Sequence, residues 1–303
     1  MFALVSSPVA NAIADEVAAL PRECCLVESG SFQIFSAQAQ QIPGSLQEIG
    51  RLRAIAFRAV GEGSDAAVDL DRFDDHYIHL FSWDLSQRQI VGAYRIGRTD
   101  RIIAESGTRG LYTRTLFRFD RRFIDRLAAP ALELGRSFVR TEYQKNYNAL
   151  LLLWKGIGRF IAKHPQYRLL FGAASISARY SAVSHQLMMS FLRQNHFAGE
   201  LAGLVDPLHA PRTTHAPDKT PCIPKSIHEV NTLVERTEPD GKGMPVLLRQ
   251  YLKLNARAIA FSVDPAFRAT LDALMLVDLA TIERPILHRY LGTDSGVRTS
   301  AAA

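Results

Sequence analysis

The sequence predicts an α/β protein in which helices flank a mixed central sheet. Short runs rich in β-branched and aromatic residues alternate along the chain with longer segments whose apolar residues recur at helical spacing. With 303 residues, of which 47% are hydrophobic and 22% are charged, the chain can bury a large core and has an ordinary globular composition. It therefore suits one large domain, or one domain with a smaller addition.

The first expected elements lead into a hairpin. Residues 31–37 have the composition of a strand, and residues 45–61 have apolar side chains on one face of a helix. Residues 76–84 and 89–97 are both β-rich, and the residues LSQR join them, which suits a hairpin. The early strands are therefore expected to pair antiparallel.

The middle of the chain alternates between helix and strand. Residues 116–129 mix aromatic residues with arginines and are expected to form a short helix or a turn. A strand at 131–139, a helix at 148–164, a strand at 167–177 and a helix at 181–197 are expected to follow.

The C-terminal third is predicted to be less regular. Residues 203–245 are rich in proline and polar residues, which is typical of a long excursion or linker. Regular structure returns at 245–282, and the tail at 292–303 is expected to be disordered.

The charge balance favours an acidic partner. A net charge of +6 and a pI near 9.3 fit nucleic acid, an anionic membrane surface or an acidic protein. The cysteines, Cys24, Cys25 and Cys222, form neither a disulfide framework nor a zinc pattern, so a reducing cytoplasm is the simplest setting. Charges interrupt both the N-terminus and the most apolar long stretch, 255–280, so neither a signal peptide nor a membrane span is expected. Any membrane contact should be peripheral.

Two opposite charges interrupt the expected strand ALELGRSFV at 131–139. Glu133 and Arg136 lie three residues apart, so a regular strand would point their side chains to opposite faces of the sheet. A β-bulge near Gly135 would bring both side chains toward one cleft and free a backbone group from the ladder, as bulges do beside active sites. A structural ion pair at the strand end is an equally good interpretation of these residues.

Other chemical motifs are weaker. The acidic segment DLDRFDDHY at 69–77 lacks the glycine and the terminal glutamate of a calcium loop, and a solvated loop face is its preferred interpretation. His76 and His79 fall on opposite faces of a strand without a third ligand, so no metal site is expected. Phosphate-binding loops, nucleophile elbows and zinc-protease motifs are absent from the sequence, which removes several large enzyme classes.

Considered together, several motifs resemble one family. The chain is similar to the acyl-homoserine-lactone synthases and to their relatives, the amino-acid N-acyltransferases of the GNAT superfamily. The residues that carry this likeness are Arg53, Phe57, Asp71, Asp74, Arg95 and the ELGR at 133–136. The phrases LELGRSFVRTEYQ, LLLLWKGIGRFI and LFGAASIS are most similar to the ornithine-lipid branch, which moves a 3-hydroxyacyl chain from acyl carrier protein to ornithine.

The resemblance covers roughly residues 30 to 200 and extends more weakly to about 290. It implies a GNAT-like core at 30–202, whose mixed sheet splays beside Glu133 so that an acyl-phosphopantetheine arm can enter the gap. Residues 203–292 would then be a helical or irregular elaboration that contacts membrane or substrate.

The resemblance also implies a mechanism. The acceptor α-amine is mostly protonated at neutral pH, so a group must receive its proton, and Glu133 is the candidate, with Arg136 beside it. A bulge N–H near Gly135 could stabilise the tetrahedral oxyanion. The expected substrate-binding residues are Arg53, Phe57, Asp71, Asp74, Arg95 and Ser137. All the proposed catalytic residues precede residue 240.

The motif expected to bind the acyl donor differs from that of enzymes that use free acetyl-coenzyme A. Their pyrophosphate loop, Q/R-x-x-G-x-G/A, cradles phosphate at a helix N-terminus, whereas this chain has QKNYNA with Tyr147 in place of the first glycine. The resemblance therefore implies a carrier-protein donor and no tightly bound cofactor. Residues expected to bind the carrier or its phosphopantetheine are Arg140, Gln144, Lys145, Asn146, Asn148 and Arg159.

The expected partners are acyl carrier protein, an amino-acid acceptor and the inner face of the membrane. Ornithine is favoured, although lysine and glycine offer the same reacting group. Nucleic acid is not expected. Residues expected to touch the membrane are Leu247, Leu248, Tyr251, Leu252, Lys253 and Arg257. Two alternatives stay open: an acyl-homoserine-lactone-type signal synthase, and a non-catalytic basic protein that binds membrane or nucleic acid.

Overall fold

An eight-stranded sheet forms the centre of the protein. The computed structural model describes residues 8–126, 130–144, 147–212 and 224–291. The strand order is β1-β2-β3-β4-β6-β7-β10-β9, with every neighbouring pair antiparallel except the parallel pair β6 and β7. A separate two-stranded sheet joins β5 to β8. The strands are β1 (Cys25–Ser29), β2 (Phe32–Gln38), β3 (Ile78–Asp84), β4 (Gln89–Arg98), β5 (Phe117–Phe119), β6 (Ala131–Val139), β7 (Leu169–Ile176), β8 (Val205–Pro207), β9 (Arg257–Asp264) and β10 (Thr270–Asp278).

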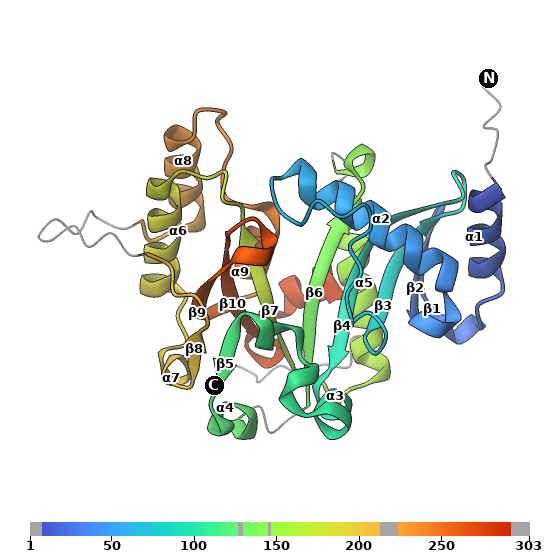
Figure 1. Ribbon diagram of the computed structural model, residues 1–303, viewed down its shortest axis with the longest axis horizontal. Coiled ribbons are helices and arrows are strands. Elements are labelled where there is room, and N and C mark those ends of the chain that lie inside the picture. Colours follow the sequence, from blue (N-terminus) through green and yellow to red (C-terminus); the bar gives the residue numbers. More distant parts are fainter. Residues whose placement is uncertain (1–7, 127–129, 145–146, 213–223, 292–303) are drawn as a thin grey trace, which may run out of the picture.

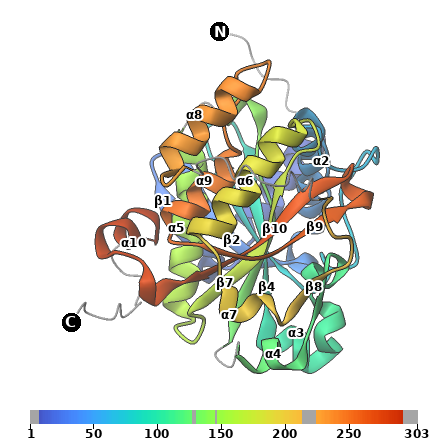
Figure 2. The ribbon, with the colours of Figure 1, turned by 90° about the vertical axis from the view of Figure 1, so that its left-hand side faces the viewer.

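Helices cover both faces of the central sheet. Figure 1 shows α2 crossing the near face over β4 and β6, while α5 lies behind the sheet. Figure 2 shows α6 and α8 side by side near the β9 edge, and α10 beside α5. The helices are α1 (Pro8–Ala18), α2 (Pro43–Ala59), α3 (Thr99–Ser106), α4 (Arg121–Arg126), α5 (Tyr147–Lys163), α6 (Ala182–Asn195), α7 (Gly199–Ala202), α8 (Ile227–Thr237), α9 (Val246–Lys253) and α10 (Arg284–Leu291).

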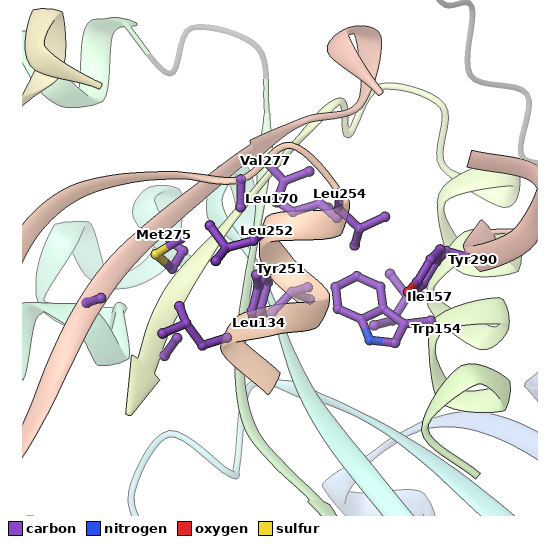
Figure 3. Packing of buried hydrophobic residues seen from close by; sticks show 14 of the residues in the cluster. Leu134, Trp154, Ile157, Leu170, Tyr251, Leu252, Leu254, Met275, Val277 and Tyr290 are labelled. Atoms are coloured by element: carbon purple, nitrogen blue, oxygen red, sulfur yellow. The ribbon is translucent and has the colours of Figure 1, made fainter. Parts of the chain in front are cut away.

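The largest core lies between the sheet and α5. Leu153, Trp154, Ile157 and Ile161 recur at helical spacing on α5 and are all buried against the sheet. Gly158 has no side chain at the point where the backbone of Leu291 comes closest, so α10 can pack directly on α5. Figure 3 shows this core where α5, α9 and α10 meet.

The C-terminal part of the chain contributes two strands to the central sheet. β10 pairs along the whole of β7, and β9 forms the outer edge. The expected membrane contact of Leu248, Tyr251 and Leu252 is wrong, because these side chains are at most 4% exposed and belong to the core. They face inward because α9 presents its apolar stripe to the sheet.

Most of the expected elements are confirmed, including the hairpin of β3 and β4 and the alternation from β6 to α6. Residues 203–245 are more regular than expected, since they contain α8. A reciprocal capping box between Ser226 and Glu229 begins this helix, and Val230 and Val234 bury its apolar face. The segment 116–129 contains β5 as well as the short α4. The tail at 292–303 lies outside the described residues.

Candidate active site

A β-bulge interrupts β6, as the sequence predicts. Ala93 of β4 pairs with Phe138 and Arg95 pairs with Gly135, so β6 has one residue more than β4 over this interval. Arg136 lies in the bulge with a φ of 50°, a left-handed conformation that residues other than glycine seldom adopt. The ladder is therefore broken where the catalytic motif was expected.

The sheet also splays at this point. β6 pairs with β7 from Ala131 to Glu133, and no ladder pair joins the two strands beyond Glu133 within the described chain. β7 continues alongside β10 as far as Ile176. At the divergence Gly172 lies against the carbonyl oxygen of Leu134, and a β-carbon there would collide with that oxygen. The expected gap between these strands is present.

Glu133 lies in a closed environment beside this gap. Its side chain is 1% exposed, and its carboxylate accepts hydrogen bonds from the Tyr77 hydroxyl and from the backbone N–H groups of Tyr112 (3.2 Å) and Thr113 (2.6 Å). Burial, together with the nearby Glu133 charge, raises the pKa of Tyr77, so its hydroxyl stays a proton donor. These bonds tie the segment before β5 to the sheet.

Arg136 lies on the same side of the sheet as Glu133, because both contact Tyr112. Its guanidinium carbon is 4.8 Å from the ring centroids of Tyr112 and of Phe267, which is favourable cation–π geometry. Arg136 lines the large cavity described below, whereas Glu133 lies behind the cavity wall. The bulge therefore brings both residues to one face but only one of them to the cleft.

A buried network of arginines and aspartates supports Arg136. The pairs are Arg53 with Asp69 (3.1 Å) and Asp74 (3.0 Å), Arg95 with Asp71 (2.6 Å) and Asp74 (3.3 Å), and Arg136 with Asp69 (3.5 Å) and Asp71 (3.2 Å). Burial opposes ionisation of Asp74, but the neighbouring arginines outweigh it and lower its pKa. The expectation of a solvated acidic loop is wrong, because the arginines compensate these carboxylates inside the protein.

This network includes most of the residues predicted for the site, but its arginines support Arg136 from behind the cavity wall. Arg53 and Arg95 are 1% exposed and lie outside the cavity wall. Phe57 and Ser137 do line the cavity, and Phe57 packs edge-on against Phe267 with their ring centroids 5.2 Å apart.

The cavity has a volume of about 670 Å³ and reaches both faces of the sheet through the gap between β6 and β7. On the α2 face it forms a polar chamber, whose wall includes Glu62, Tyr112, Arg136, Ser175, Asp264 and Asp272. On the α5 face it forms an apolar arm, whose wall includes Tyr94, Leu134, Leu150, Trp154, Leu247 and Tyr251.

Three carboxyl groups in the polar chamber, those of Glu62, Asp264 and Asp272, were not anticipated from the sequence. Asp272, on β10, is 3% exposed and accepts hydrogen bonds from the hydroxyls of Ser175 (2.6 Å) and Thr270 (3.3 Å). Burial raises the pKa of Asp272 to about 7, and burial together with the nearby Asp272 raises the pKa of Glu62 to about 7. No salt bridge of the described chain includes either group. Asp272 interrupts an apolar strand as Glu133 does, so the same sequence signal was available.

Of the residues predicted for the donor side, Arg140 and Gln144 follow directly after β6. Gln144 lines the cavity and donates from Nε2 to the carbonyl of Val139 at 3.0 Å, while Arg140 approaches Glu142 at 3.5 Å. Asn148 lies in the first turn of α5 and Arg159 lies farther along this helix. Lys145 and Asn146 are outside the described residues.

Histidines in this region are structural. His79 Nε2 lies 2.8 Å from the carbonyl oxygen of Asp74, and His76 Nε2 lies 3.1 Å from that of Gly110. Over the described ranges, no group of three or more histidine, cysteine or acidic side chains could hold a metal ion.

A match to a domain family first defines the class of domain. Residues 52–155 match the acetyltransferase (GNAT) domain family. An acyl-homoserine lactone synthase that depends on coenzyme A, BjaI, aligns over 90% of this chain and 95% of its own, at 12% identity and a TM-score of 0.43.

Curated relatives then define the family. The glycine N(alpha)-acyltransferase of Bacteroides thetaiotaomicron is 30% identical over 246 residues, which are 77% of this chain and 73% of the relative. The L-ornithine N(alpha)-acyltransferase of Brucella abortus is 29% identical over 73% of this chain and 74% of its own. The chain belongs to this GNAT-type family of amino-acid Nα-acyltransferases.

Proposed function

We propose that the protein transfers an acyl chain from the phosphopantetheine thioester of an acyl carrier protein to the α-amine of an amino acid, giving a lyso-aminolipid. The cavity that passes through the splayed sheet is the observation that carries this proposal. Its polar chamber fits a charged acceptor and its apolar arm fits an acyl chain. The thioester would lie between them, beside the bulge of β6.

The side chains of the polar chamber suit the proposed reaction. Arg136 can bind the acceptor carboxylate, and Asp272 or Glu62 can take a proton from the ammonium group because their pKa values lie near 7. The amine nitrogen then attacks the thioester carbon, the carbon–sulfur bond breaks, and the thiol leaves with a proton. A free N–H at the bulge would stabilise the oxyanion. Glu133 acts as a positioning residue in this scheme, and its role as the base stays a prediction.

The acceptor is proposed to be ornithine. Relatives include enzymes named for glycine and for ornithine. Ornithine carries a second ammonium group, which a chamber lined by Glu62, Asp264 and Asp272 would stabilise, whereas glycine has no group for the extra carboxylates.

The donor is proposed to be a carrier protein rather than free coenzyme A. Tyr147 replaces the first glycine of the pyrophosphate loop, and only glycine lets the backbone approach a phosphate so closely. Basic residues after β6 and on α5, Arg140 and Arg159, would attract an acidic carrier.

The product is proposed to leave through a mouth that touches the membrane. Val60 (47% exposed) and Val246 (53% exposed) line the cavity beside Arg179 and Lys242. Exposed apolar residues next to basic ones favour an anionic bilayer surface. The described helices include none with the length and apolarity needed to cross a membrane.

A transfer assay with purified protein tests these proposals. Acyl carrier protein and coenzyme A thioesters of one chain are each offered with ornithine, lysine or glycine, and products are identified by mass spectrometry. The proposal expects acyl-ornithine from the carrier thioester. Transfer to S-adenosylmethionine followed by lactone formation would instead indicate a signal synthase, and the absence of any acylated amine would refute the function.

Flotation with anionic and neutral vesicles tests the membrane contact. Replacing Val60 and Val246 with aspartate should abolish flotation with anionic vesicles while transfer in detergent persists. Unchanged flotation of the variant would refute the proposed mouth.

A further inference from the structure

The apolar arm of the cavity is closed at its inner end by aromatic rings. Along α5, the wall of the arm includes Leu150 and Leu151, which are half-buried, and then Trp154, which is 0% exposed. The next residue on this face of the helix, Ile157, is also 0% exposed and does not belong to the wall. The arm therefore ends at the turn of α5 that carries Trp154.

The helix α9 shows the same change in exposure along the arm. Val246, in its first turn, is 53% exposed and lines the cavity, whereas Tyr251 is 3% exposed and is the last residue of this helix in the wall. Leu252 follows in the core and takes no part in the wall. Both helices thus have one end at the mouth of the cavity and a closed end in the core.

Tyr290 of α10 completes the closed end. Its side chain is 5% exposed and lines the cavity, and its ring meets that of Trp154 edge-on with the centroids 6.4 Å apart. The rings of Tyr94 and Tyr251 also meet Trp154 edge-on, at centroid distances of 5.9 and 5.5 Å. Figure 3 shows Tyr290 beside Trp154, where α5, α9 and α10 meet. We call these four aromatic residues the floor of the arm.

The surrounding structure holds Tyr290 in place. Its hydroxyl donates to the side-chain oxygen of Gln250 on α9. The next residue, Leu291, packs its backbone against α5 at Gly158, where there is no room for a β-carbon. Turning the ring aside would break the hydrogen bond and disturb this helix contact, and a close-packed interior offers no empty space for it.

We propose that Tyr290 sets the longest acyl chain that the protein accepts, because its ring helps to close the arm that holds the chain. The inference rests on the proposed acyl transfer, and it adds an upper limit on donor length and the residue that fixes this limit. A chain that is one methylene too long must displace the floor, which discriminates against it by roughly 10-fold or more. Tyr290 lies outside the matched GNAT domain at 52–155, so the limit belongs to the C-terminal part of the chain.

A chain-length series tests the proposal. Acyl carrier protein loaded with saturated chains of rising length is offered with ornithine, and kcat/KM is compared in the wild type, Tyr290→Leu and Tyr290→Phe. The wild type should lose roughly 10-fold or more in kcat/KM at the first length that meets the floor. Tyr290→Leu has a smaller side chain that deepens the arm, so it should recover this loss, whereas Tyr290→Phe keeps the ring and should keep the wild-type limit.

Leu287→Ala is the matched control for these variants. It removes buried volume from the same helix, since Leu287 is 2% exposed, but its side chain does not belong to the cavity wall. The control should therefore be less stable than the wild type and keep the same length limit.

Three results would overturn the proposal: a wild type without an upper length limit, a folded Tyr290→Leu variant with an unchanged limit, or a Leu287→Ala variant that moves the limit as far as Tyr290→Leu does. Absence of transfer at every chain length refutes the proposed function. A labelling measurement then decides the inference.

That measurement uses the wild-type protein, so it depends neither on transfer nor on the folding of a variant. Fatty acids of rising length with a photoreactive diazirine on the terminal carbon are bound and irradiated, and the labelled residue is identified by mass spectrometry. The longest acid that binds should label Tyr290 or its neighbours in the floor. A label confined to the mouth at Val60 and Val246, or no label at all, overturns the proposal.

Discussion

Replacing Glu133 with glutamine should destabilise the fold more than it slows the chemistry. The carboxylate accepts from Tyr77, Tyr112 and Thr113, and glutamine turns one acceptor oxygen into a donor that faces at least one of these donors. Hydrogen bonds to a buried charged group contribute roughly 1.5–3 kcal/mol each, and an unsatisfied buried donor costs about 1–3 kcal/mol. We therefore expect a loss of about 2–4 kcal/mol in unfolding free energy, because glutamine retains part of the bonding.

Urea unfolding of the wild type and of Glu133→Gln gives this free energy, and single-turnover transfer is measured on the same preparations. Tyr77→Phe serves as the matched control, since it removes one donor to the same carboxylate and should be partly non-additive with Glu133→Gln. The reasoning is refuted by a stable Glu133→Gln variant whose transfer falls by about 10²–10⁴-fold, which is the usual loss of a general base. That result would make Glu133 the proton acceptor.

Three further predictions concern other parts of the site. Asp272→Asn should lower transfer by about 10²–10⁴-fold. Folding raises the pKa of Asp272 from 3.8 to about 7, so the unfolding free energy of the wild type falls as the pH rises through that interval. In urea unfolding, the asparagine variant should therefore become more stable relative to the wild type on going from about pH 5 to about pH 8. A stability difference that is the same at these two pH values would contradict this. Arg53→Gln leaves Asp74 with one arginine fewer and should cost about 3–5 kcal/mol in the same measurement, and a loss below about 1 kcal/mol would show that the network relaxes. Gly172→Ala should lower the thermal unfolding midpoint, since its β-carbon meets the Leu134 carbonyl oxygen, whereas Gly203→Ala, in open space, should change it little.

Local patterns in the sequence were sufficient to predict much of the fold. The apolar runs at 131–139 and 167–177 are strands because their side chains are buried on both faces of the sheet. The bulge of β6 was predictable because Glu133 and Arg136 break the alternation that a regular strand needs. α8 was missed because the proline-rich composition around it concealed a capping box and an apolar face.

The residues that meet in the polar chamber could not be predicted from local sequence patterns. Asp272 meets Ser175 because β10 pairs with β7 in one register, and residues almost a hundred positions apart give no local sign of that pairing. Glu62 follows the end of α2 in a polar segment whose exposure the sequence does not reveal. The expectation that all chemistry precedes residue 240 is not supported by the cavity wall, which includes Asp264 and Asp272.

The protein contains two kinds of buried carboxyl group, and their strand positions decide which can exchange a proton. Asp71 and Asp74 lie among the arginines of α2, β4 and β6, which outweigh burial and lower their pKa values, so both stay ionised at neutral pH. Asp272 lies on β10, where its hydrogen-bond donors are the hydroxyls of Ser175 and Thr270. Burial outweighs these bonds and the charge of Arg136 and raises its pKa to about 7. A proton acceptor works best when its pKa is near the working pH, and the ionised aspartates are too weakly basic for that role. The arginine network therefore positions Arg136, while the β10 side of the chamber is suited to proton transfer.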